Sequence, residues 1–136
     1  MGKLLQRLQD SSRSGVYRVR SDAAVLDALR GGGLTPRKVS LKGAATKAEL
    51  LNRLAQALEL PAWFGGNWDA LEDCLNEIEG HLVFYDYQGI EADDLGVLID
   101  VLASSAEFWA GRGTPFFAVF VDPVGKLPLA ELYRET

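Results

Sequence analysis

The chain has 136 residues, of which 48% are hydrophobic and 24% are charged, and its formal net charge is -5. This length fits one globular domain whose core needs neither a disulfide nor a structural metal, and a single cysteine excludes a disulfide within the chain. No apolar run is long enough to cross a bilayer, and the charged N-terminal stretch does not fit a signal peptide, so we expect no membrane partner and a cytoplasmic location.

The charge is distributed unevenly along the chain. Residues 54–111 contain twelve acids and neither lysine nor arginine, a formal charge of -12, while all 14 basic residues and the other seven acids lie outside this interval and give +7. Such a segment is attracted to a basic partner and repelled by nucleic acid, although acidic surfaces also serve solubility alone.

The first elements predicted along the chain are a strand, a helix and a second strand. Residues 15–20 alternate between apolar and basic side chains, which predicts a strand with mixed faces. Ser21 and Asp22 begin a helix, and the glycines at 31–33 end it. These glycines lack the spacing of a nucleotide-binding loop. Residues 37–41 follow as a strand.

Two helices are predicted next. Thr46 and Glu49 form a capping box ahead of an apolar stripe, and Pro61 closes that helix. Residues 62–66 form a loop, and Asn67 is a favoured N-cap for a helix over residues 67–79.

The last elements are two apolar strands separated by a long helix. Residues 81–86 and 116–121 are β-branched or aromatic runs, and residues 93–111 have helical periodicity. The order βαβααβαβ predicts an α/β fold with a small parallel sheet of three to four strands packed with helices. We expect the first dozen residues and the chain after Asp122 to be loosely held.

The helix predicted at residues 67–79 divides into two faces. Its apolar side comprises Trp68, Leu71, Cys74, Leu75 and Ile78, and its other side comprises Asp69, Glu72, Asp73 and Asn76. Like charges at these spacings oppose helix formation, which suggests compensation by basic groups of a partner. A solvated acidic face is the alternative interpretation. Trp63 is either an aromatic anchor beside the acids or a core residue.

The stretch LPAWFGGNWDALEDCL, residues 60–75, resembles the signature of the barstar family of ribonuclease inhibitors. In that signature, a proline, two aromatics and a glycine precede an Asn-x-Asp-Ala-Leu-x-Asp-Cys-Leu helix. The resemblance extends more loosely over residues 37–121. It implies the barstar-like fold and a division into an N-terminal βα extension at residues 1–35 on the same domain, a barstar-like domain at 36–122 and a C-terminal tail at 123–136.

The resemblance also implies a function: a cytoplasmic, monomeric protein whose acidic helix fills the cleft of a basic, barnase-like ribonuclease. Asp73 would be the central charge and Asp69 would pair with a second basic group. Gly65 would permit close backbone approach. The residues expected to bind the partner are Trp63, Phe64, Gly65, Gly66, Asn67, Asp69, Glu72, Asp73 and Asn76. Glu72 and Gly66 differ from the best-known member, which has an aromatic and an acid there, and this bears on which enzyme is the target.

Three other functions compete with ribonuclease inhibition. An immunity protein or regulator on the same scaffold, directed at a non-ribonuclease toxin, is compatible with the sequence. An enzyme is disfavoured because the chain has no nucleophile motif, metal-ligand cluster or nucleotide loop, so we expect no catalytic residues and no cofactor. We expect His81 to be structural and Cys74 to be a buried, inert thiol. A nucleic-acid binder is disfavoured by scattered basic residues without an aromatic platform.

Overall fold

The structure is a computed structural model that describes residues 2–133, and it contains one parallel sheet. The strands are β1 (Gly15–Val19), β2 (Arg37–Ser40), β3 (Gly80–Tyr85), β4 (Phe116–Val121) and β5 (Ala130–Glu131), in the spatial order β2-β3-β4-β1-β5. Every pair of neighbouring strands is parallel. The predicted α/β class is therefore confirmed, with one strand more than expected.

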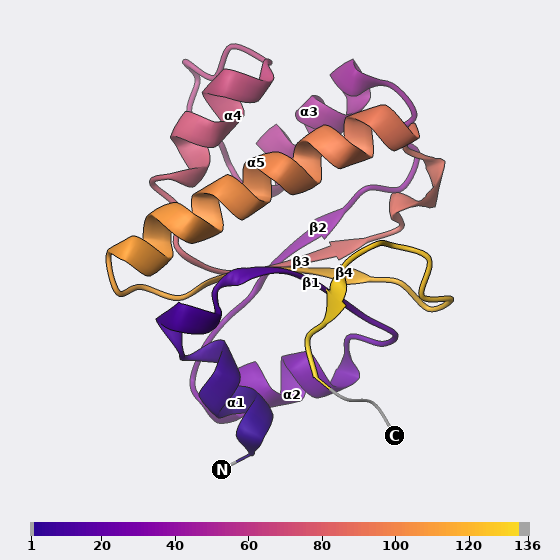
Figure 1. The fold of residues 1–136 in the computed structure, drawn as a ribbon. Coiled ribbons are helices and arrows are strands. Elements are labelled where there is room, and N and C mark those ends of the chain that lie inside the picture. Colours follow the sequence, from indigo (N-terminus) through magenta and orange to yellow (C-terminus); the bar gives the residue numbers. More distant parts are fainter. Residues whose placement is uncertain (1, 134–136) are drawn as a thin grey trace.

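Helices cover both faces of this sheet. They are α1 (Lys3–Leu8), α2 (Ala23–Gly31), α3 (Lys47–Ala57), α4 (Trp68–Leu75) and α5 (Ala92–Gly111), with 3-10 turns η1 (Ser11–Arg13) and η2 (Tyr87–Gly89). Figure 1 shows α3, α4 and α5 on one side of the sheet and α1 and α2 on the other. The predicted order βαβααβαβ is present, with α1 added before it and β5 after it.

Two of the local signals for helix ends act as expected, whereas α3 ends at Ala57, before Pro61, where Glu59 has a φ of 52°. The capping box is complete: Thr46 accepts from the Glu49 amide, and Glu49 accepts from the Thr46 amide. At the end of α2, Gly33 has a φ of 72°, and the Leu34 amide reaches back to the Leu29 carbonyl at 2.8 Å. A positive φ at this position is what glycine supplies without strain.

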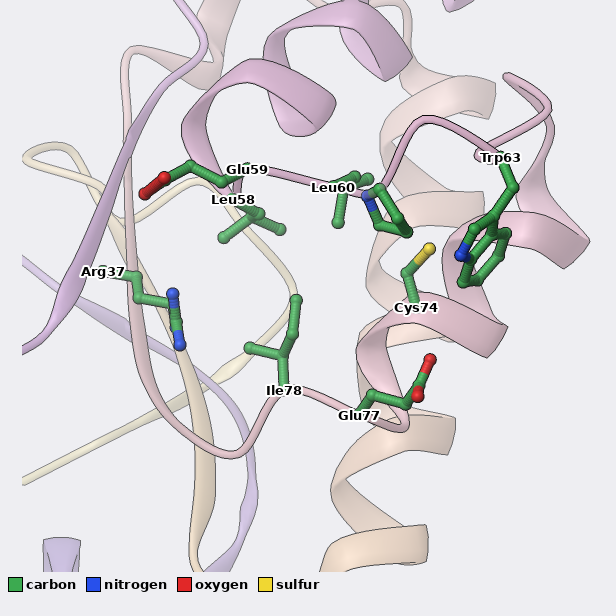
Figure 2. A pocket seen from close by; sticks show the side chains of 9 residues that line it. Arg37, Leu58, Glu59, Leu60, Trp63, Cys74, Glu77 and Ile78 are labelled. Atoms are coloured by element: carbon green, nitrogen blue, oxygen red, sulfur yellow. The ribbon is translucent and has the colours of Figure 1, made fainter.

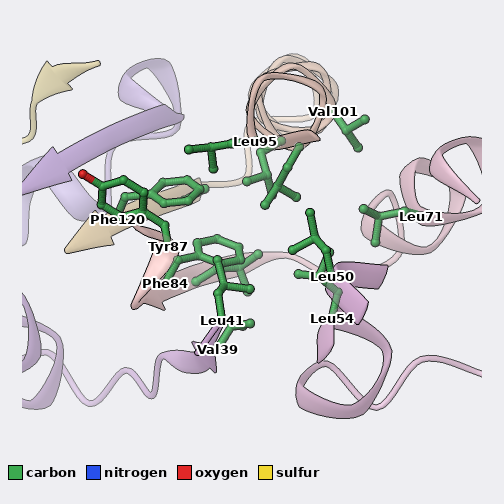
Figure 3. Packing of buried hydrophobic residues seen from close by; sticks show 14 of the residues in the cluster. Val39, Leu41, Leu50, Leu54, Leu71, Phe84, Tyr87, Leu95, Val101 and Phe120 are labelled. Carbon is green, nitrogen blue, oxygen red and sulfur yellow. The ribbon is translucent and has the colours of Figure 1, made fainter. Parts of the chain in front are cut away.

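Two hydrophobic cores lie on the two faces of the sheet. The larger core lies under α3, α4 and α5, and Figure 3 shows side chains from these helices meeting those of the strands. The smaller core lies against α1 and α2. Strand β4 serves both, because Phe116 and Phe120 enter the larger core and Phe117 and Val119 the smaller one. This explains its continuous apolar run.

The expectation that the first dozen residues are loosely held is wrong. Leu5 and Leu8 are buried, and His81 Nε2 donates to the Leu8 carbonyl oxygen at 2.7 Å, which fastens α1 to the beginning of β3. Arg7 donates to the carbonyl oxygen of Leu132. The N-terminal helix therefore packs as part of the fold.

The same expectation is wrong for residues 123–133, which pack onto the fold. Leu127 and Leu132 are buried in the larger and the smaller core respectively. The buried Asp122 carboxylate accepts from the Tyr87 hydroxyl at 2.6 Å and from the Leu127 amide at 2.8 Å. These bonds fold the segment back, so that β5 pairs with β1. Residues 134–136 lie outside the described part of the chain.

Candidate functional site

Helix α4 is held in a fixed position by its cap and by α5. The Asn67 side chain accepts from the Ala70 amide at 2.8 Å, which confirms the predicted N-cap. Leu71 and Leu75 are buried in the larger core. Trp109 of α5 donates its indole N–H to the Leu75 carbonyl oxygen at 3.0 Å, which ties the end of α4 to α5.

The helix is shorter than its periodicity predicts. It ends at Leu75 rather than near residue 79, and the amides of Glu77 and Ile78 bond three residues back, to Cys74 and Leu75, at 3.0 Å each. Asn76 is the C-cap, and its Oδ1 atom is buried without a hydrogen-bond partner in the part of the chain that the structure describes. Asn76 therefore does not extend the row of acidic side chains along the helix.

One exposed hollow, which we call the α4 groove, brings together five of the predicted residues. It is lined by Trp63, Gly65, Asn67, Asp69 and Asp73, together with Lys47, Trp68 and Ala70. Trp63 is 59% exposed, which excludes the interpretation of this side chain as a core residue. Within residues 2–133, neither Asp69 nor Asp73 has a salt-bridge partner. The groove thus presents an aromatic surface beside two unpaired carboxylates.

Glu72 lies apart from this groove. Its carboxylate accepts a hydrogen bond from the Ser104 hydroxyl of α5 at 3.2 Å, and the side chain is half-buried. The three acids predicted to form one row therefore divide into two groups. Asp69 and Asp73 line the groove, and Glu72 bonds to α5.

Two glycines lie in the loop before α4, one with a positive φ and one close to the N-cap side chain. Gly66 has a φ of 69°, which glycine adopts without strain. A Cβ at Gly65 would lie 3.3 Å from the Asn67 Nδ2 atom and would press on the N-cap side chain. Phe64 is half-buried and packs against the larger core, and its amide bonds to the Pro61 carbonyl at 2.9 Å. Phe64 thus supports the loop from beneath, while Trp63 faces outward.

Sequence reasoning missed Lys47 as a residue of the groove. It lies at the first position of α3, outside the acidic interval of residues 54–111, and folding brings it beside Asp69 and Asp73. No local pattern in the sequence indicates this proximity. Its single positive charge leaves the two carboxylates of the groove in excess.

The cysteine and the histidine are buried side chains. Cys74 is 2% exposed, and burial, with the nearby charges of Glu77 and Asp73, raises the pKa of its thiol. His81 is 7% exposed and stacks on Phe117, and burial lowers its pKa although the hydrogen bond to the Leu8 carbonyl opposes this. A raised thiol pKa makes a poor nucleophile at neutral pH.

Residues 2–133 contain no cluster of three or more His, Cys, Asp or Glu side chains that could hold a metal ion. Nor does that region contain a helix with the length and apolar character needed to span a membrane.

Comparison with known proteins identifies the family. A family model described as Barstar (barnase inhibitor) matches residues 34–121. The chain belongs to the barstar family. The match runs from β2 to β4 and includes the α4 groove, whereas α1, β1, α2 and β5 lie outside it. The barstar family is a family of inhibitors, so the chain is a barnase-inhibitor-like protein. No curated protein matches the chain.

Proposed function

We propose that this barstar-family protein inhibits a basic ribonuclease by occupying its active site with α4 and the loop at residues 62–66. The observation that carries the proposal is the α4 groove, where Trp63 of the loop and Asp69 and Asp73 of α4 are exposed together in the region matched by an inhibitor family. Basic groups that bind RNA phosphates would bind these carboxylates instead.

The contacts within the fold support a pre-organised inhibitor. Asn67 fixes the start of α4, Trp109 holds its end, and Phe64 anchors the loop to the core. Because the helix is already ordered, little conformational entropy is lost when it binds. In this proposal Asp73 is the central charge, Asp69 pairs with a second basic group, and Trp63 packs against the rim of the enzyme cleft.

The charge distribution supports fast association. A formal charge of -12 over residues 54–111 would attract a basic enzyme before contact. Salt screens charges on a length of about 8 Å at physiological ionic strength. We therefore expect the association rate to fall as salt increases, and we expect the chain itself to turn over no substrate.

The test is a titration of the purified chain into a barnase-type, guanyl-specific ribonuclease while RNA cleavage is followed. We expect stoichiometric inhibition by the wild type, loss of inhibition with Asp73→Ala, and full inhibition with Glu79→Ala. Glu79 is the matched control because it is exposed and lines a different hollow, beside His81. Undiminished cleavage at equimolar wild-type protein would contradict the proposal for this enzyme class.

The presence of Glu72 at its position on α4 favours a variant of this proposal, in which the bound protein differs from the target of the best-known family member. The Glu72 side chain, bonded to Ser104, stands where that member has a large aromatic side chain. A basic toxin other than a ribonuclease would then be held by the same α4 groove. Binding of such a toxin, together with full RNA cleavage in the titration, would select this variant.

A further inference from the structure

A second hollow also has Trp63 in its lining, but neither Asp69 nor Asp73 lines it. It is lined by Arg37, Leu58, Glu59, Leu60, Pro61, Trp63, Cys74, Glu77 and Ile78. Figure 2 shows Ile78 and Leu58 in its middle, with Trp63 at one end and Arg37 at the other. Trp63 lines both hollows, so the second one adjoins the α4 groove at this side chain.

The charges in this hollow are placed unevenly. Figure 2 shows Glu59 and Arg37 at the end away from Trp63, where their formal charges offset each other. Glu77 lies on the same side as Trp63 and Cys74, and the charge of Glu77 contributes to the raised pKa of the Cys74 thiol. The net negative charge of the hollow is therefore located toward the end that carries the exposed indole.

An aromatic ring next to a carboxylate binds a particular kind of side chain. The face of an indole attracts a cation, and the carboxylate accepts its N–H donors. The apolar side chains of Leu60 and Ile78 are suited to the aliphatic stem that carries the charge of lysine or arginine. A short basic group without such a stem would leave these apolar side chains uncovered.

We propose that Trp63 and Glu77 form a second subsite, which takes one lysine or arginine side chain of the same basic partner. The inference rests on the proposed function, because the partner reaches this hollow only when it is seated on the α4 groove. The indole then separates two basic groups of the partner: one bound by Asp69 and Asp73, the other by Glu77. Glu77 thereby becomes a residue that determines specificity, since it selects partners with a basic residue beside the cleft.

The first experiment compares Glu77→Gln with Glu79→Gln, using a barnase-type ribonuclease as the probe. Both variants remove one charge from the short segment between α4 and β3, but Glu79 lines the hollow beside His81 instead. We expect the inhibition constant at low salt to rise roughly three- to tenfold for Glu77→Gln and less than about twofold for Glu79→Gln. At high salt the two variants should converge, because the lost interaction is electrostatic.

A double-mutant cycle with Trp63→Leu tests whether the two side chains bind the same cation. Trp63 is largely exposed, so its replacement should leave the fold intact, which a thermal melt checks. We expect the effect of Glu77→Gln to shrink to less than about twofold in the Trp63→Leu background. Equal effects in both backgrounds would contradict a shared cation.

The outcomes separate the two proposals. If Asp73→Ala abolishes inhibition while Glu77→Gln and Glu79→Gln behave alike, the proposed function stands and the second subsite is refuted. If the wild type does not inhibit the ribonuclease at all, both proposals fail for this enzyme class.

Discussion

Deletion of residues 1–33 tests our proposal that the N-terminal extension is an integral part of the domain, although the family match begins at residue 34. The deleted segment supplies Leu8, Val19, Val25 and Leu29, each at most 2% exposed. Burial of such a side chain contributes roughly 1.5–3 kcal/mol. The four together approach the total stability of a typical domain, about 5–15 kcal/mol.

The deletion also removes β1 from between β4 and β5 and uncovers Phe117 and Val119. An open edge beside an uncovered apolar face favours aggregation. We expect the truncated chain to show no cooperative melt by circular dichroism and to elute as aggregates. The milder variant Leu29→Ala should cost about 2–5 kcal/mol, and Val124→Ala, at a 63% exposed site, less than about 0.5 kcal/mol. A truncated chain that melts cooperatively near the wild-type temperature would refute this reasoning.

Three further predictions concern single side chains. Asn67→Ala should destabilise the protein by about 1 kcal/mol in urea denaturation, because the Ala70 amide loses its acceptor; an unchanged midpoint would contradict the role of the cap. Asp122→Asn should cost about 1–3 kcal/mol in the same assay, because an amide has one acceptor oxygen for two buried donors; a cost below about 0.5 kcal/mol would exclude this account. Burial holds the pKa of His81 below its ordinary value of 6.5, so stability should be full above that pH and fall as the pH drops below it, and His81→Gln should flatten this slope in thermal melts between about pH 7 and pH 5. An equal slope in the variant would show that other groups cause it.

The parts of the fold that the sequence predicted are those specified locally. The capping box at Thr46 and Glu49, the N-cap at Asn67 and the glycines at 31–33 act through neighbouring backbone groups, so their residues alone indicate the helix ends. The apolar run of β4 similarly indicates a strand covered on both faces.

The parts that the sequence did not predict depend on contacts between distant residues. Strand β5 has two exposed residues, and its position follows from the bonds made by Asp122 and by Arg18, which donates to the Leu129 carbonyl at 2.8 Å. The stripe through Ile78 predicted a longer α4, but the chain tightens after Leu75 and turns into β3.

The candidate site was likewise predictable only where neighbouring residues specify it. The residues around Asp69 and Asp73 could be named from helical spacing and from the family resemblance. The contact of Glu72 with α5 and the position of Lys47 in the groove required the packed helices, because each joins residues from separate elements. The exposure of Trp63 likewise depends on how the loop lies over the core.

Competition with a mononucleotide tests the central claim, occupation of the ribonuclease active site, most directly. The affinity of the chain for a catalytically inactive, barnase-type ribonuclease is measured by calorimetry at increasing concentrations of guanosine monophosphate, which binds in that active site. Our account predicts that the apparent Kd rises in proportion to the nucleotide concentration once the nucleotide is in excess of its own Kd. An apparent Kd that stays constant while the nucleotide saturates the enzyme would show that the chain binds elsewhere, and would contradict the proposal.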